Sequence, residues 1–172
     1  LCKDLKATEG HMKIRGQKLM YYIFEKKNLN ANQGAEIENG AENAETSYQE
    51  EQQESSVLLT DSDAEKKGVG LLPVLMANGG PGYSHDYMLP LKGSACFGRK
   101  VVMYDQVGTG RSDRPTEADG KPAKYLFDPM YYVEELDALR DHLGIKKHHA
   151  LGHSWGTMLI QLYAGRNPAH LG

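Results

Sequence analysis

The stretch His149–Gly165, HALGHSWGTMLIQLYAG, decides the fold that we expect for the rest of the chain. A short apolar run leads into a serine set between two glycines, Gly152-His153-Ser154-Trp155-Gly156, and apolar residues at helical spacing follow. Small residues two positions before and after a serine permit a sharp strand-to-helix turn that exposes the hydroxyl. The stretch predicts a strained nucleophilic serine, Ser154, with the peptide N–H of Trp155 directed at a developing oxyanion; an ordinary turn is the alternative.

The segments upstream of this motif predict a parallel sheet. Residues 71–77 and 100–105 are apolar runs that each end in a glycine-rich loop, and runs of this length suit central parallel strands covered on both faces. Strands alternating with helices predict an α/β fold with right-handed crossovers, in which ligands gather outside the carboxyl ends of the strands. The other expected elements are a hairpin of residues 13–15 and 19–24 around Gly16-Gln17, a strand over 146–151, and helices over 84–91, 129–143 and 157–166.

Two glycine-rich loops follow the expected central strands. In Asn78-Gly79-Gly80-Pro81-Gly82 the glycines allow close approach to a substrate, and an N–H of Gly79 or Gly80 would complete an oxyanion hole; a plain turn is the alternative. The stretch Asp105–Ser112 lacks the third glycine of a dinucleotide fingerprint and the Gly-Lys-Ser/Thr of a phosphate loop. We expect it to be a structural loop that supports the site, with Arg111 paired to a carboxylate such as Asp105.

Length, charge and cysteine content exclude several classes of protein. The 172 residues suit one domain over 1–172, and the net charge of −3 makes nucleic acid an unexpected partner. No apolar run approaches the roughly 18–20 residues of a membrane span, so no membrane association is expected. Cys2 and Cys96 lie far apart without metal-ligand spacing. We expect Cys96 to pack as a small hydrophobe in a reducing, cytoplasmic compartment, with a single extracellular bridge as the open alternative.

The segment 28–68 differs in composition from the rest of the chain. Between Asn28 and Lys67 it carries ten acidic residues against two lysines, and its only apolar break is Val57-Leu58-Leu59. Such a segment cannot bury enough apolar surface to offset the entropy of ordering. We therefore expect a disordered acidic insertion that acts as a solvated spacer; an acidic interaction tail is the alternative.

Three motifs in a fixed order carry a resemblance to a known family. They are GGPG at Gly79–Gly82 followed by YSHDY at Tyr83–Tyr87, then YDQxGxGRSDRP from Tyr104, then GHSWG from Gly152. Together they resemble the proline iminopeptidase family of α/β-hydrolases over roughly residues 71–170. The resemblance implies the α/β-hydrolase fold, with the N-terminal part of a mostly parallel sheet present and the C-terminal half and the cap missing.

The resemblance also implies an activity and the residues that carry it. Ser154 is implied as the catalytic nucleophile, and Gly79, Gly80 and Trp155 as the oxyanion hole. Enzymes of this family remove an N-terminal residue, commonly proline, from peptides or amides, without a metal ion or a cofactor. We therefore expect a serine aminopeptidase that acts through an acyl-enzyme on a peptide or aminoacyl-amide substrate and needs no metal and no cofactor.

Two positions depart from the family pattern. Asn78 stands where the family usually has histidine, and Val107 stands where it often has arginine. We expect altered packing or substrate fit at these positions rather than lost chemistry. Relatives with an aliphatic residue at the position of Val107 include amino-acid amidases, so an amidase or an esterase on the same scaffold stays open. A non-catalytic product that binds partners through its acidic segment is the alternative from another class.

The acid and the base of a catalytic triad are not expected within this chain. In α/β-hydrolases both follow the serine in chain order, so we expect them downstream of residue 172 and expect this chain alone to be inactive. His170, just past the expected helix, is not the predicted base, and His153 is expected to point away from Ser154. The oligomeric state is left open.

Overall fold

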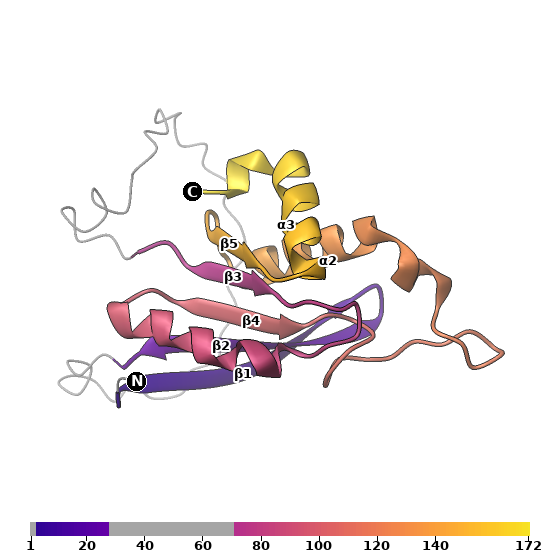
Figure 1. Cartoon of the computed structure of the whole chain (residues 1–172), viewed down its shortest axis with the longest axis horizontal. Coiled ribbons are helices and arrows are strands. Elements are labelled where there is room, and N and C mark those ends of the chain that lie inside the picture. The colour runs from indigo at the N-terminus through magenta and orange to yellow at the C-terminus, as the bar shows by residue number, and fades with distance from the viewer. Residues whose placement is uncertain (1–2, 28–70) are drawn as a thin grey trace, which may run out of the picture.

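One mixed sheet organises the computed structural model, which describes residues 3–27 and 71–172 (Figure 1). The elements in chain order are β1 (Leu5–Ile14), β2 (Gln17–Lys26), β3 (Val74–Ala77), η1 (His85–Phe97), β4 (Val101–Asp105), η2 (Lys124–Phe127), α2 (Pro129–His142), β5 (His149–Gly152), α3 (Trp155–Arg166) and η3 (Pro168–His170). The sheet order is β1-β2-β4-β3-β5, with β3 parallel to β4 and β5. The predicted parallel arrangement is confirmed for these three strands, whereas β2 runs antiparallel to β1 and to β4.

The predicted N-terminal hairpin is present and longer than the sequence indicated. Ile14 pairs with Gln17 across the two-residue turn Arg15-Gly16, in which both residues have positive φ, 47° and 82°. Such a turn matches the right-handed twist of the flanking strands. Because β2 then pairs with β4, the hairpin is continuous with the parallel part of the sheet.

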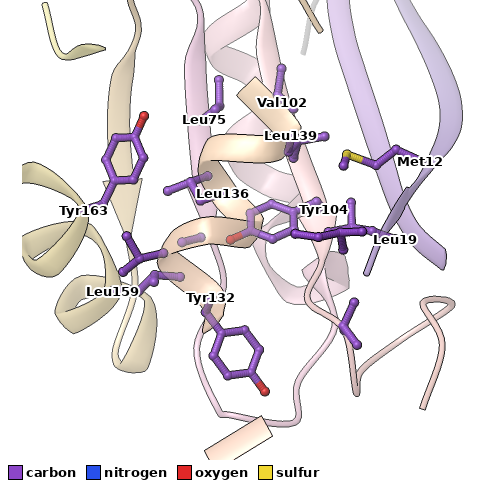
Figure 2. Packing of buried hydrophobic residues seen from close by; sticks show 14 of the residues in the cluster. Met12, Leu19, Leu75, Val102, Tyr104, Tyr132, Leu136, Leu139, Leu159 and Tyr163 are labelled. Carbon is purple, nitrogen blue, oxygen red and sulfur yellow. The ribbon is translucent and has the colours of Figure 1, made fainter. Parts of the chain in front are cut away.

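The core lies on both faces of the central strands, as the continuous apolar runs predicted. Alternate residues of a strand face opposite sides, so Leu75 and Val102 pack on one face with α2 and α3 (Figure 2). Met76 and Met103 pack on the other face with residues of η1. β3 and β4, the two strands that lead into the glycine-rich loops, are therefore enclosed between helices.

The helix ends follow the expected signals, with one difference. The Asp128 side chain accepts a hydrogen bond from the Met130 N–H at 2.9 Å at the start of α2, and Gly144 follows the helix with φ 65°. The helix expected over 84–91 instead extends as the 3₁₀ helix η1 to Phe97. Cys96 in η1 is disulfide-bonded, so the prediction that Cys96 packs as a free thiol is wrong. The expectation of a reducing compartment rested on unpaired cysteines and loses that support.

Some expectations fall outside the described residues. The acidic insertion predicted at 28–68 lies within residues 28–70 and stays a prediction. In residues 3–27 and 71–172, no helix is both long and apolar enough to cross a membrane. No group of three or more His, Cys, Asp or Glu side chains in this part of the chain could hold a metal ion.

Glu135 of α2 is a fully buried carboxyl group under the sheet. Its Oε2 accepts a hydrogen bond from the Val107 N–H at 3.0 Å, while its Oε1 has no partner within the described residues. Burial disfavours the charged form and raises the pKa of Glu135 to about 8, against the smaller opposing effect of the Val107 hydrogen bond. The folded protein therefore favours the protonated acid.

We predict that Glu135 makes the protein less stable as the pH rises. A carboxyl whose folded pKa lies above its unfolded value contributes stability below the unfolded value, 4.5, and loses it as the pH rises toward 8. The loss is on the order of 5 kcal/mol. Glu135→Gln stays neutral and keeps an acceptor for Val107, so its unfolding midpoint should exceed that of the wild type by more at pH 8 than at pH 5.

The control for this experiment is Glu134→Gln, the same substitution one residue earlier. Glu134 is partly exposed and forms ion pairs with Arg15 and Arg166, so its removal should change stability by about 0.5 kcal/mol or less at either pH. The variant-minus-wild-type difference also removes the contribution of His148, whose burial lowers its pKa to about 4. Parallel pH–stability curves for Glu135→Gln and the wild type would contradict the prediction.

Candidate active site

Ser154 sits at a sharp turn between β5 and α3. Its φ of 52° and ψ of −120° are strained for a residue with a side chain. The Gly156 N–H donates to the His153 carbonyl and the Thr157 N–H to the Ser154 carbonyl, both at 2.9 Å, which closes the turn. The strand-to-helix turn that the sequence predicted is present, and it exposes Ser154.

The glycines on either side of Ser154 are required by close backbone contacts. A Cβ on Gly152 would lie 2.3 Å from the Gly156 carbonyl oxygen, and a Cβ on Gly156 would lie 2.1 Å from the Ala77 carbonyl oxygen. Neither contact can be relieved by moving a flexible side chain. Gly152 is therefore required by the tight turn between β5 and α3, and Gly156 by the close approach of α3 to the end of β3.

The Asn78–Gly82 loop lies directly beside the serine. A Cβ on Gly79 would stand 3.1 Å from Ser154 Cβ. Gly79, Gly80 and Ser154 line one pocket of about 270 Å³ together with Tyr83, Tyr87 and His153. Trp155 is the first residue of α3, and its indole is turned toward Gln106. The structure thus brings Ser154, Gly79 and Gly80 into one pocket, and Trp155 follows the serine directly.

Tyr87 is a pocket residue that the sequence analysis missed. Its hydroxyl oxygen accepts a hydrogen bond from the Gly79 N–H at 2.5 Å and lies 3.0 Å from His153 Nδ1. The N–H predicted to face an oxyanion is therefore engaged by a phenol in this structure. The His153 imidazole contacts Tyr87 at the wall of the pocket that Ser154 also lines, and within the described residues it forms no hydrogen bond to Ser154. The spacing of eight residues between Gly79 and Tyr87 gave no signal of this contact.

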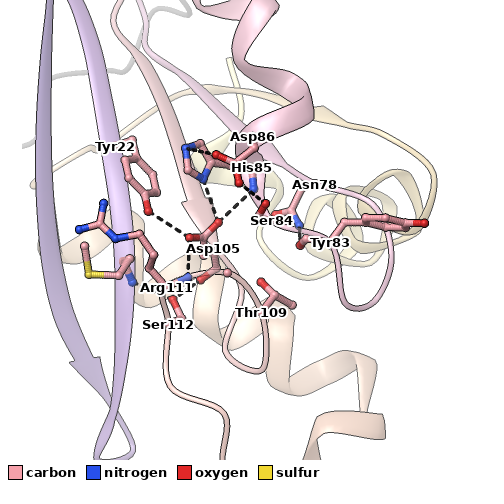
Figure 3. Close-up of polar contacts among 12 residues, drawn as sticks. Tyr22, Asn78, Tyr83, Ser84, His85, Asp86, Asp105, Thr109, Arg111 and Ser112 are labelled. Carbon is pink, nitrogen blue, oxygen red and sulfur yellow. Dashed lines mark hydrogen bonds and ion pairs between the residues drawn. The ribbon is translucent and has the colours of Figure 1, made fainter.

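Asp105, the last residue of β4, is a buried hydrogen-bond centre (Figure 3). Its carboxylate accepts hydrogen bonds from the His85 N–H at 3.0 Å, from His85 Nδ1 at 2.9 Å and from the Tyr22 hydroxyl at 3.0 Å. Burial raises the pKa of Asp105, but the hydrogen bonds from His85 and Arg111 outweigh burial and lower it. The ionised carboxylate thereby joins β2, η1 and the loop after β4.

Arg111 does pair with a carboxylate, as expected, but the partner is Glu9 and not Asp105. Arg111 approaches Asp105 through its backbone N–H, at 3.0 Å, while its guanidinium pairs with Glu9 at 2.8 Å on the surface. The reason is the tight turn at Gly110, φ 49°, where a Cβ would lie 2.3 Å from the carboxylate. The loop does support the site, but through backbone rather than side-chain contacts.

No described histidine partners Ser154. His170 lies at the far end of α3, where its Nδ1 is 3.0 Å from Asp137 Oδ1 and 3.2 Å from the Tyr163 hydroxyl. α3 has 12 residues and is about 18 Å long, and His170 follows its C-terminal end whereas the serine turn lies at its N-terminal end. In residues 3–27 and 71–172, the Ser154 hydroxyl forms no hydrogen bond to a histidine. The expectation that His170 is not the base agrees with this position.

The fold and the pocket define a class of protein. A strained serine between a parallel strand and a helix, beside a glycine-rich loop at the carboxyl end of the neighbouring strand, is the arrangement of an α/β-hydrolase. The family model of the alpha/beta hydrolase fold matches residues 73–171, and the chain belongs to this family. The predicted fold is confirmed.

Individual relatives are more specific. The chain is 45% identical over 92 residues to a proline iminopeptidase of Lactobacillus helveticus, a match that covers 53% of this chain and 30% of that protein. It is 43% identical over 95 residues to a proline iminopeptidase of Clostridioides difficile, covering 55% and 30%. The chain thus spans about 30% of the length of these curated relatives.

Solved structures share the fold at lower identity. The proline iminopeptidase of Mycobacterium smegmatis superposes with a TM-score of 0.63 at 24% identity, over 95% of this chain and 41% of that one. An epoxide hydrolase of Vigna radiata superposes with a TM-score of 0.59 at 15% identity, over 96% of this chain and 36% of that one. These two neighbours act on different substrates, so they support the fold alone.

We predict that Gly156→Ala destabilises the protein. The new methyl group would collide with the Ala77 carbonyl, so α3 must shift away from β3, at a cost of about 1–3 kcal/mol. Gly165→Ala is the matched control, because the same substitution in the same helix meets no atom within 4 Å. It should leave stability unchanged or raise it by about 0.5–1 kcal/mol. Urea unfolding of both variants measures this, and equal midpoints would refute the close contact.

Proposed function

We propose that the whole protein is a serine aminopeptidase that releases an N-terminal residue, preferentially proline, from peptides. The observation that carries the proposal is the strained Ser154 in one pocket with Gly79 and Gly80. The identity of 41–45% to proline iminopeptidases over 92 residues supports the substrate class. The match covers 30% of the length of those proteins, so we state the activity of the whole protein as a proposal.

The proposed reaction assigns a role to each predicted residue. Ser154 Oγ attacks the carbonyl carbon of the N-terminal residue, and a base outside the described residues takes the hydroxyl proton. The carbonyl oxygen becomes an oxyanion that accepts hydrogen bonds from the Trp155 N–H and from Gly79 or Gly80. Collapse breaks the C–N bond, the proton passes to the leaving amine, and water then hydrolyses the acyl-enzyme.

An amidase or esterase on the same scaffold is the second candidate. Val107 is fully buried in the core cluster with its N–H on Glu135, so this position brings no charged side chain to the pocket. The neighbouring epoxide hydrolase fold shows that the scaffold itself does not select the substrate. Turnover of prolyl amide, other aminoacyl amides and simple esters by the whole protein distinguishes the two candidates.

The first experiment is activity-based labelling of the whole protein. A fluorophosphonate should modify Ser154, and a prolyl arylamide should be cleaved; Ser154→Ala should abolish labelling and lower kcat by roughly 10⁴-fold or more. Ser94→Ala, at a partly exposed serine in η1, is the control and should retain both signals. Labelling that survives Ser154→Ala, or no labelling at all, would reject the proposal and favour a non-catalytic product.

We predict that Tyr87 competes with the substrate carbonyl. The Tyr87 hydroxyl holds the Gly79 N–H at 2.5 Å, so a carbonyl oxygen must displace it before that N–H can serve the oxyanion. Tyr87→Phe removes the competing acceptor, which is worth about 1 kcal/mol, or roughly a fivefold change. The second-order rate of fluorophosphonate labelling should rise by about that factor. Tyr83→Phe, which lines the same pocket, is the control; a slower reaction in Tyr87→Phe alone would contradict the competition.

A further inference from the structure

Gln106 lies directly between the two loops that would form the oxyanion hole. It follows β4, its side chain is fully buried, and it lies outside the pocket itself. Its amide nitrogen donates to the Asn78 carbonyl oxygen at 3.0 Å and approaches Asn78 Oδ1 at 3.4 Å. Its amide oxygen accepts from Trp155 Nε1 at 3.1 Å. One side chain therefore contacts both loops.

The orientation of the Gln106 amide follows from its partners. The Asn78 carbonyl can only accept a hydrogen bond, and the indole N–H of Trp155 can only donate one. The primary amide of glutamine offers a donor and an acceptor on the same planar group, which matches both partners. A carboxylate would lack the donor for Asn78, and a thioether would lack both strong hydrogen bonds.

Each contact lies next to a predicted oxyanion donor. Asn78 precedes Gly79, whose N–H faces the pocket, and Trp155 carries the other predicted donor on its own backbone. The backbone of Gln106 is held firmly, because its main-chain carbonyl oxygen accepts hydrogen bonds from the Thr109 N–H at 2.9 Å and from the Thr109 hydroxyl at 2.8 Å. A fixed amide thus sets the distance between two backbone donors from distant parts of the chain.

We propose that Gln106 is a positioning residue that holds the Gly79 loop and Trp155 in register, so that both N–H groups reach the same oxyanion. This inference rests on the proposed function of Ser154. It gives a role to Gln106, a residue that the family resemblance did not place in the active site. Gln106 does not touch the substrate. It acts through the placement of the two donors, and small misplacements of such donors lower kcat strongly.

The test compares Gln106→Met and Trp155→Phe in the whole protein. Gln106→Met keeps the length of the side chain and removes both contacts, whereas Trp155→Phe removes the indole N–H and keeps the backbone donor. With a prolyl arylamide we expect kcat to fall at least tenfold in Gln106→Met and about threefold in Trp155→Phe, with KM within about twofold of the wild type. Gln161→Met, an exposed glutamine of α3, is the matched control and should keep kcat.

Two further measurements separate positioning from folding. The indole N–H resonance of Trp155, identified by its loss in Trp155→Phe, should shift and exchange faster with solvent in Gln106→Met. The double variant should lose no more than Gln106→Met alone, because both changes break one connection. If Gln106→Met does not fold, the kcat of Trp155→Phe decides whether the contact between Gln106 and Trp155 positions the donors.

The outcomes distinguish the two proposals. Wild-type protein without Ser154-dependent turnover overturns the proposed function and, with it, this inference. Turnover in the wild type together with unchanged kcat in Gln106→Met, or in Trp155→Phe where the first does not fold, overturns only the role of Gln106. A fall in kcat that multiplies in the double variant would also contradict a single shared connection.

Discussion

The rest of the structure depends on the backbone contact between the first turn of α3 and the end of β3. At Gly156 the helix backbone lies so close to the Ala77 carbonyl that no side chain fits between them. Because β3 pairs with β5 and continues into the Asn78 loop, this contact fixes the serine turn against Gly79. The strain of Ser154, about 1–3 kcal/mol for such a backbone, persists because the sheet and the helix on either side are held independently.

The end of β4 organises its surroundings on two sides. Successive residues of a strand point to opposite faces. Asp105 accordingly joins β2 and η1 through Tyr22 and His85, whereas Gln106 reaches Asn78 and the indole of the serine turn. Both side chains are buried and fully engaged, and the loss of either would leave unpaired polar groups, which is more costly than the hydrogen bonds themselves are favourable. The Asp105–Ser112 loop, which partly matches a nucleotide-binding motif, thus supports the structure around the pocket.

The elements that short-range rules govern were predictable from the sequence. The Asp128 cap, the parallel runs of β3 and β4 and the Ser154 turn each follow from local spacing and conformational preference. The errors arose where partners lie far apart in the chain: Tyr87 on the Gly79 N–H and the guanidinium of Arg111 on Glu9 depend on how the elements meet. One sequence carries no record of such pairings, because the hydrogen bonds of a tyrosine or an arginine have no periodicity.

The hydrogen bond between Gly79 and Tyr87 explains how the pocket can keep a backbone donor ready for a substrate without leaving that donor unpaired. An unpaired N–H in a partly buried site is unfavourable unless water or a side chain satisfies it. The phenol of Tyr87 provides that acceptor in the resting structure, and it stands on η1, an element separate from β3 and α3. Because Tyr87 is 44% exposed, its ring can leave without disturbing the core. The donors set by the sheet therefore stay in place while their occupant changes from a phenol to a carbonyl oxygen, which is the preorganisation that oxyanion stabilisation requires.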